Sequence, residues 1–124
     1  LIPGSLNEVI LNKLYSYEKD KLYKIFYDTG KEIALKFKVY FPDLPSLLNI
    51  INILIRFFPL KKLDLIKTEE KRGTINRLIL VGAGQSIVTT NCVLSFIKGF
   101  FETYGAVIIK EIVNLGLIDI EFKY

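Results

Sequence analysis

The clearest alternation of apolar and polar residues lies at the C-terminal end of the chain. From residue 118 to residue 124 every second residue is apolar, and the residues between them are charged. A period of two is typical of a strand with one buried face and one face in water. The preceding Asn114-Leu115-Gly116 has the composition of a hairpin turn. The pattern therefore predicts an antiparallel hairpin at the end of the chain.

A helix is predicted immediately before this hairpin, at residues 91–104. Gly105 favours an end there, because glycine readily adopts the left-handed conformation that follows many last helical turns. Ser95, Lys98 and Glu102 form one narrow polar stripe, and nearly all of the remaining surface is apolar. Such a helix must be covered by other parts of the protein on most of its sides.

Two amphipathic helices are predicted at the start of the chain. Residues 5–8 have the form of a capping box, and residues 6–16 continue with apolar positions at helical spacing. A longer helix is predicted at residues 18–41, where Leu22, Phe26, Ile33 and Phe37 fall on one stripe and prolines end the run. Gly30 in its middle costs about 1 kcal/mol relative to alanine. It indicates either a close approach of another backbone or a break in the helix.

A third helix is predicted at residues 47–58, with Ser46 as its N-cap and Pro59 after its end. It is apolar around almost its whole circumference. The segment has twelve residues, whereas a membrane span needs about twenty, so a buried helix and no transmembrane segment is expected.

Residues 61–68 and 74–81 predict two strands joined by a charged turn. Gly82-Ala83-Gly84 then invites comparison with a dinucleotide-binding loop, but the third glycine of that motif would fall at Ile87. No βαβ unit surrounds the motif either, so a flexible strand-to-helix connection is the simpler interpretation.

The predicted order is α-α-α-β-β-α-β-β within a single domain, residues 1–124. Short connections between strands favour antiparallel pairing. The expected fold class is therefore α+β, a four-stranded antiparallel sheet with the helices packed on one face.

Composition indicates either a large core or an apolar surface shared with a ligand or partner. The chain is 51% hydrophobic, with a mean hydropathy of +0.35. Its net charge of +4 is mild, and its lysine groups fit solvated faces better than nucleic-acid binding. A single cysteine permits no intramolecular disulfide, which fits a reducing, cytoplasmic location.

The chain has no histidine, which excludes Ser-His-Asp catalysis and a Cys/His zinc site within one chain. The acidic residues fall in a turn or on the wet face of a strand, so no acid-base pair is predicted. Cys92 is the remaining candidate nucleophile. Three roles are open to it: a packing residue, a pocket wall or acylation site, and a catalytic thiol. We expect no enzyme activity, metal or cofactor.

Several short motifs resemble those of a known family. They are Leu1-Ile2-Pro3, Tyr27-Asp28-Thr29-Gly30-Lys31, Cys92 with Gly99, and Glu111, Gly116 and Phe122 of the closing hairpin. Spread over nearly the whole chain, they resemble the 4-vinyl-reductase domain, a hydrocarbon-binding domain that shares the fold of the TRAPP vesicle-tethering subunits. The resemblance implies a dimer-forming domain that binds small hydrophobic molecules, often as the ligand sensor of a regulator.

The chain departs from this family at three positions. Many members carry two further cysteines in the closing hairpin, where this chain has Ile112 and Ile120. A second family glycine falls at Ala34. Metal or multi-cysteine chemistry of relatives is therefore not carried over to this chain.

The candidate binding residues lie on the two helices that are apolar nearly all round. They are Ile51, Leu54, Phe57, Phe58, Cys92, Phe96 and Phe100. For any single residue, ordinary core packing is the alternative to a pocket wall. For the group, one sheet cannot cover both helices, so a ligand, a second subunit or both are expected.

Two functions follow as hypotheses. The first is non-enzymatic binding of a hydrocarbon, lipid or aromatic molecule between the apolar helices of a homodimer. The second is a dimeric assembly module without a ligand, as in vesicle-tethering subunits, in which the apolar helices form a permanent protein interface.

Overall fold

The computed structural model describes residues 3–51, 60–71 and 73–124, with side chains from residue 19 onward. All strand pairs are antiparallel, and the sheet order is β1-β2-β4-β3. The fold is therefore α+β with a four-stranded antiparallel sheet, as predicted. The elements in chain order are α1 (Pro3–Phe37), α2 (Leu44–Leu48), β1 (Lys62–Glu70), β2 (Gly73–Val81), α4 (Ile87–Thr103), β3 (Val107–Asn114) and β4 (Leu117–Lys123).

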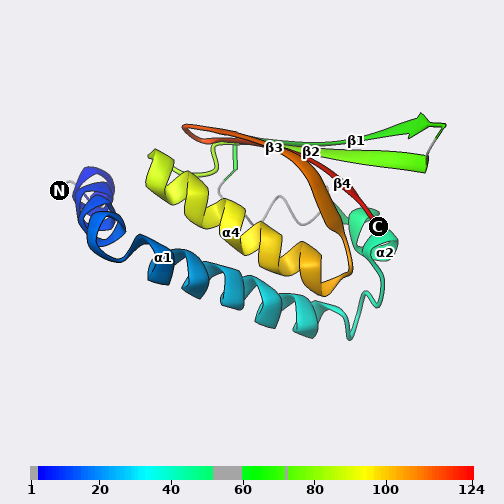
Figure 1. Cartoon of the computed structure of the whole chain (residues 1–124), viewed down its shortest axis with the longest axis horizontal. Helices are drawn as coiled ribbons and strands as arrows, with labels where there is room; N and C mark the ends of the chain where they lie inside the picture. Colours follow the sequence, from blue (N-terminus) through cyan, green and yellow to red (C-terminus); the bar gives the residue numbers. More distant parts are fainter. Residues whose placement is uncertain (1–2, 52–59, 72) are drawn as a thin grey trace.

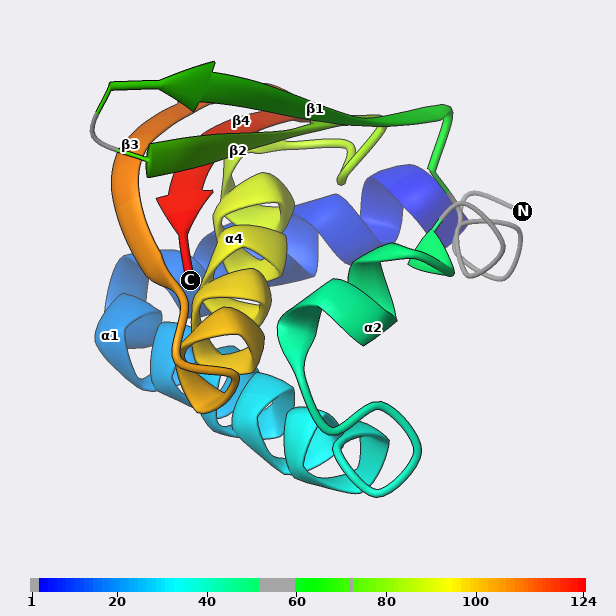
Figure 2. The same cartoon turned by 90° about the vertical axis from the view of Figure 1, so that its right-hand side faces the viewer.

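These elements form three layers (Figure 1). The sheet is one outer layer, α4 lies against one of its faces, and α1 packs on the far side of α4. The view in Figure 2 shows the same stacking, with α2 to one side of α4. We call the sheet face towards α4 the inner face. The opposite, outer face carries no helix among the described residues.

The predicted element order was wrong at the N-terminus. The two expected helices at residues 6–16 and 18–41 are one continuous helix, α1, so the described order is α-α-β-β-α-β-β. Residues 16–18 contain neither proline nor glycine, and nothing in the local sequence ends the helix there. Gly30 does not break the helix either.

The predicted third helix begins earlier than residue 47. The N-cap of α2 is Asp43, whose Oδ1 accepts a hydrogen bond from the backbone N–H of Ser46 at 2.8 Å. Ser46 therefore lies within the first turn and is not the cap. α2 ends at Leu48, and residues 52–59 of the predicted helix lie outside the described residues.

Gly30 and Gly99 mark the crossing of α1 and α4. A Cβ atom at Gly30 would collide with the backbone carbonyl of Phe96, and one at Gly99 would collide with the carbonyl of Tyr27. Ala34, one turn further along α1, is 0% exposed at the same helix pair. The absence of side-chain bulk thus lets the two backbones touch. Of the two interpretations of Gly30, a close approach of another backbone is therefore the correct one, and a break in the helix is not.

The core of the sheet lies on the inner face of β4. Ile118, Ile120 and Phe122 are each 0% exposed, as the alternation predicts. In the neighbouring strand β2, Leu80 and Leu78 pair with Ile118 and Ile120. The two central strands therefore present one continuous apolar surface to α4.

The ends of α4 are fixed by local hydrogen bonds. The helix begins four residues earlier than predicted, because Ser86 caps it and forms a capping box with Thr89. It ends before Gly105, which has the left-handed φ of +79°. The start of α4 also holds the β3–β4 turn, since the hydroxyl of Thr90 accepts from the N–H of Gly116 at 2.9 Å.

The 82–86 connection is anchored at several points. The N–H groups of Gly82 and Ala83 both donate to the carbonyl of Gly116, at 2.8 and 2.9 Å. Gly116 itself has a φ of +71° in the predicted turn. These bonds attach the strand-to-helix connection to the closing hairpin and place it at one end of α4.

The outer face of the sheet carries a two-pronged ion pair. Arg77 of β2 donates from Nε to Oδ1 of Asp119 at 2.9 Å and from Nη2 to Oδ2 at 2.6 Å. Asp119 is the more enclosed partner, with 13% of its side chain exposed. The hydrogen bonds from Arg77 are the main reason that the pKa of Asp119 lies below its usual value.

A pH dependence follows from this pair. Because the pKa of Asp119 is lower in the folded than in the unfolded chain, its stabilisation is present above the unfolded pKa of about 4. It is lost as the pH falls through the folded pKa. We expect Asp119→Asn to lower the melting temperature at neutral pH and to bring the two melting temperatures together in acid. Glu69→Gln, at an exposed carboxylate of β1, is the control. Parallel melting curves for Asp119→Asn and wild type at every pH would contradict this expectation.

Candidate ligand-binding cavity

A cavity of about 260 Å³ lies between α1, α2, α4 and the β1–β2 half of the sheet. Every described side chain that lines it is apolar, and glycines complete the wall. The lining residues are Ile33, Phe37, Leu47, Ile51, Leu60, Leu63, Leu78, Leu80, Gly82, Ala83, Gly84, Val93, Phe96, Ile97, Phe100 and Phe101.

Helical spacing explains the largest share of this wall. The lining residues of α4 are five apolar side chains at positions 93, 96, 97, 100 and 101, which is one face of a helix. α1 adds Ile33 and Phe37, one turn apart. The sheet contributes Leu78 and Leu80 of β2, which point to the same face because they are two residues apart.

Phe100 lies at the centre of the aromatic side chains around the cavity. Its ring meets that of Phe37 edge to face, with centroids 5.7 Å apart. Phe96 stacks on it at 6.2 Å, and Tyr104 lies at 5.4 Å. Edge-to-face and offset contacts at these distances are favourable between aromatic rings. The arrangement offers further ring edges and faces to an aromatic or aliphatic guest.

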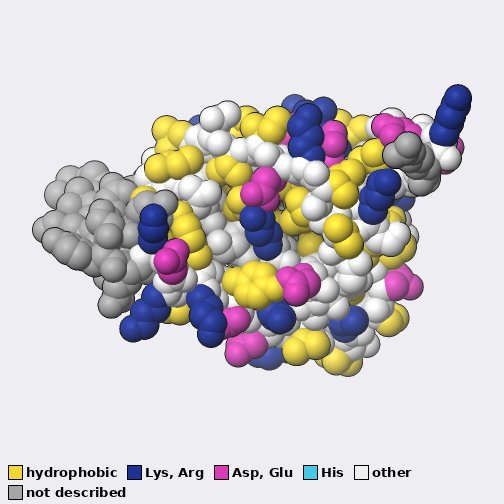
Figure 3. Space-filling model, viewed as in Figure 1, with side chains coloured by type: hydrophobic (Ala, Val, Ile, Leu, Met, Phe, Trp, Pro, Cys, Tyr) yellow, Lys and Arg dark blue, Asp and Glu magenta, His cyan; other side chains and the backbone are white. Residues whose placement is uncertain are grey.

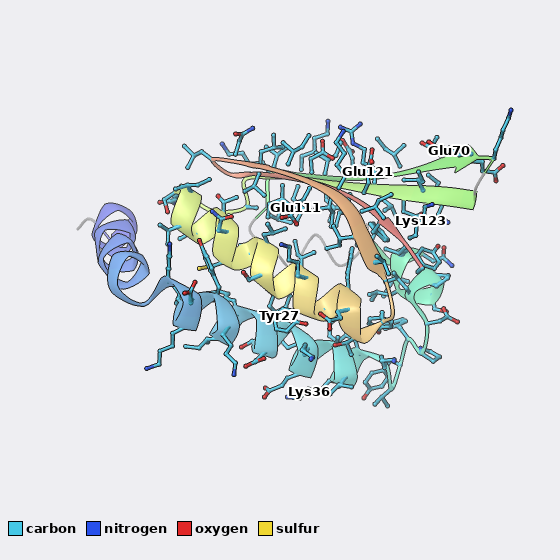
Figure 4. All side chains as sticks on the ribbon, in the orientation of Figure 1. Tyr27, Lys36, Glu70, Glu111, Glu121 and Lys123 are labelled. Atoms are coloured by element: carbon cyan, nitrogen blue, oxygen red, sulfur yellow. The ribbon has the colours of Figure 1, made fainter. Side chains whose placement is uncertain are left out.

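Polar groups near this layer are directed to protein partners. The hydroxyl of Tyr104 donates to the carbonyl of Phe41 at 2.8 Å, and burial is the main reason that the pKa of Tyr104 is raised. Lys98 pairs with Glu111 of β3 at 2.9 Å. Tyr27 donates to Glu102 across the α1–α4 crossing, where Figure 4 shows Tyr27 directed from α1 towards α4. None of these groups lines the cavity.

Asn76 is the one buried side chain among the described residues with an unpaired acceptor. It is 2% exposed on the inner face of β2, two residues before Leu78, and its Oδ1 accepts no hydrogen bond. Asn76 is not among the residues that line the cavity. The cavity wall therefore offers neither a charge nor a hydrogen-bonding side chain from the described part of the chain.

The structure brings three of the predicted site residues together and sets one apart. Ile51, Phe96 and Phe100 line the cavity. Cys92 is 2% exposed on α4 but is not among the lining residues. Leu54, Phe57 and Phe58 lie outside the described residues.

Residues from α1 and the first hairpin were missing from the predicted site. The spacing of Ile33 and Phe37 marks them as an apolar stripe, and Leu78 and Leu80 belong to a recognisable strand. The sequence therefore carried a signal that these residues are buried. It carried none for which buried residues border the cavity, because that depends on how the layers meet.

Other kinds of site find no support in the described residues. Within residues 3–51, 60–71 and 73–124, no three His, Cys, Asp or Glu side chains gather as metal ligands would. On the face that Figure 3 presents, basic and acidic side chains are interspersed, unlike the one-sign patches that bind nucleic acid. No helix in the described ranges is long and apolar enough to cross a bilayer.

Comparison of the chain with protein-family models, with curated proteins and with solved structures finds no match.

Proposed function

We propose that this chain binds a small, uncharged, apolar molecule in the cavity between α1, α4 and the inner face of the sheet, without chemically converting it. The observation that carries the proposal is a cavity of about 260 Å³ with an apolar lining. An ionised ligand would lose its hydration there and gain no partner, which costs far more than apolar burial returns. The ligand class is therefore a neutral hydrocarbon, an aromatic molecule or a short aliphatic chain.

The size of the cavity supports a ligand rather than a packing imperfection. An apolar cavity of about 150 Å³ is sufficient to bind benzene in another protein. A molecule that fills the space covers an apolar wall, and each Å² of apolar surface removed from water contributes about 25 cal/mol.

The positions of the family-like residues are a second support. Gly30 and Gly99 meet at the helix crossing, Gly116 forms the closing turn, and Phe122 is fully buried below α4. Each therefore has a structural reason to be the residue it is. This is in keeping with the proposed likeness to the hydrocarbon-binding 4-vinyl-reductase domain, and with a role as a ligand sensor.

The test combines ligand identification with a variant that fills the cavity. Native protein is extracted with organic solvent and examined by mass spectrometry, and apo protein is titrated with the neutral fluorophore N-phenyl-1-naphthylamine. We expect Phe96→Trp to weaken binding of the fluorophore at least tenfold, because the larger ring occupies the space of the ligand. The melting temperature should change little. Tyr40→Trp, at a 79% exposed position, is the control for adding the same ring elsewhere.

The outcomes separate the two hypotheses. A stoichiometric apolar compound in the extract, or saturable binding that only Phe96→Trp weakens, supports the ligand site. If nothing is extracted and the fluorophore does not bind, the assembly module is the better account. Strong destabilisation by Phe96→Trp without a binding defect would identify this wall as ordinary core.

A further inference from the structure

The first strand of the sheet has an uncovered edge. β1 pairs with β2 along its whole length, from Lys62 opposite Val81 to Glu70 opposite Gly73. Its other side has no strand partner among the described residues, because β1 is the first strand in the sheet order. The hairpin extends beyond the helical layers in Figure 1, and Figure 4 places Glu70 at its far end. From Ile66 to Glu70 every residue of β1 is exposed.

The opposite edge of the sheet is protected, and β1 is not. β3 has a register irregularity between Ile108 and Lys110, and such a bulge interrupts regular pairing with a further strand. A central self-pairing of β3 would also place Lys110 or Glu111 against its own copy. β1 has an unbroken register with β2 and contains neither proline nor glycine. A long, regular edge of this kind is competent to pair with another strand.

The charges of β1 have opposite signs at its two ends. Lys61 and Lys62 stand at its start, and Glu69 and Glu70 form its end. Charges on an edge strand usually prevent pairing, because like charges meet. In an antiparallel pair of two copies, however, the start of one strand lies beside the end of the other. The basic start of each strand then lies beside the acidic end of its partner.

We propose that β1 is a self-association edge, on which a second copy of this chain docks its own β1 antiparallel and joins the two sheets into one of eight strands. The two copies are then related by a two-fold axis perpendicular to the sheet, and residues opposite each other must point to the same face of the joined sheet. Because side chains alternate between the two faces, opposed residues must be an even number of positions apart in the sequence. If the axis passes beside Ile66, Lys62 of each copy lies opposite Glu70 of the other, so this pair forms at both ends. The two copies of Ile66, each 43% exposed, then lie opposite each other in the middle.

Neighbouring registers are less favourable. An axis on Lys67 opposes the two copies of Lys67 and brings Asp64 opposite Glu70. An axis on Leu65 opposes Lys61 and Glu69, but it leaves Lys62 opposite Thr68 and Asp64 opposite Ile66. Of these three registers, the one centred on Ile66 alone pairs opposite charges of β1 itself at both ends and has a β-branched pair in the middle, which is a favourable cross-strand combination. This register also brings Lys61 opposite Lys71, a like-charged pair just beyond the two ends of β1.

This association is expected to be weak and dependent on salt. The contact is one strand wide, so it belongs to the small, transient class of interfaces. Exposed ion pairs are screened as the ionic strength rises. We therefore expect a monomer–dimer equilibrium in the micromolar range or weaker that shifts to monomer in high salt. The inference is independent of the cavity, since it requires no ligand.

The test is a charge exchange followed by sedimentation velocity across micromolar to millimolar concentrations. Lys62→Glu alone opposes two glutamates at each end of the paired strands, and Glu70→Lys alone opposes two lysines. Each single variant should be monomeric where the wild type dimerises. Mixed in equal amounts, the two variants should form a heterodimer, because both end pairs are then of opposite sign. Lys21→Glu, at an exposed position of α1, changes the net charge as Lys62→Glu does. This control variant should dimerise like the wild type.

Three results would overturn the proposal. They are a wild type that is monomeric over the whole range, single variants that dimerise as the wild type does, and a mixture that fails to recover the dimer. The second result would place self-association on another surface, and the third would reject this register. Circular dichroism and thermal melting of each variant establish that it is folded, so that loss of the dimer is attributed to the edge.

Discussion

Gly99→Ala is expected to lower the free energy of unfolding by about 3 kcal/mol, at the upper end of the cost of overpacking. The new methyl group would occupy the position of the Tyr27 carbonyl of α1, and a backbone carbonyl cannot turn aside as a side-chain end can. The two helices would have to separate along their contact. We expect the melting temperature to fall by roughly 10 °C or more.

The sign of this result is informative, because helix propensity alone predicts the opposite. Alanine within a helix is favoured over glycine by about 1 kcal/mol. Gly30→Ala should be as damaging, since its methyl group would meet the carbonyl of Phe96. Thr29→Ala is the control on the adjacent, exposed position of α1. A stabilised Gly99→Ala protein would show that the helix crossing is wider than described.

Phe122→Ala is expected to cost about 3–5 kcal/mol, whereas Phe96→Ala should cost markedly less. Phe122 is 0% exposed, and the centroid of its ring lies 4.7 Å from that of Phe101. Truncation of Phe122 therefore leaves a buried cavity in the core. Phe96 is half-buried and already borders the cavity, so part of its surface has no packing partner to lose. Chemical denaturation of both variants measures the difference.

The comparison tests the cavity through stability alone. The same atoms are removed in each variant, so the two losses differ only through the burial and the packing of the ring. Equal losses at Phe96 and Phe122 would mean that Phe96 is as tightly packed as the core of β4. Addition of a ligand that fills the cavity should raise the stability of the wild type through mass action, and Phe96→Ala should alter that increment more than Phe122→Ala does.

The strands were predictable because each pattern is local. The alternation from Ile118 to Phe122 reflects one buried and one wet face of a single strand, and Gly116 supplies the turn before it. The N-terminal helices were less predictable. A capping-box sequence at residues 5–8 and a central glycine suggested boundaries that the continuous helix α1 does not have. Caps and propensities are weak preferences that neighbouring structure overrides.

The candidate site was predictable only for the faces that carry a helical signal. Phe96 and Phe100 were identified because α4 has too little polar surface to lie in water. Leu63 and Leu80 border the same cavity, yet their sequence neighbourhoods resemble those of any inward-facing strand residue. A cavity is the space that several elements fail to fill together. Its position therefore depends on interlayer distances that no single segment encodes.

The pairing of α1 with α4 also sets an order of events during synthesis. α1 is complete at Phe37, whereas α4 is complete only at Thr103, 66 residues later. At a ribosomal elongation rate of about 5–20 residues per second, several seconds separate the two helices. Throughout that interval the surface of α1 around Gly30 and Ala34 has no α4 to cover it. A nascent chain that stalls before α4 therefore presents this surface to chaperones and to other unfinished copies.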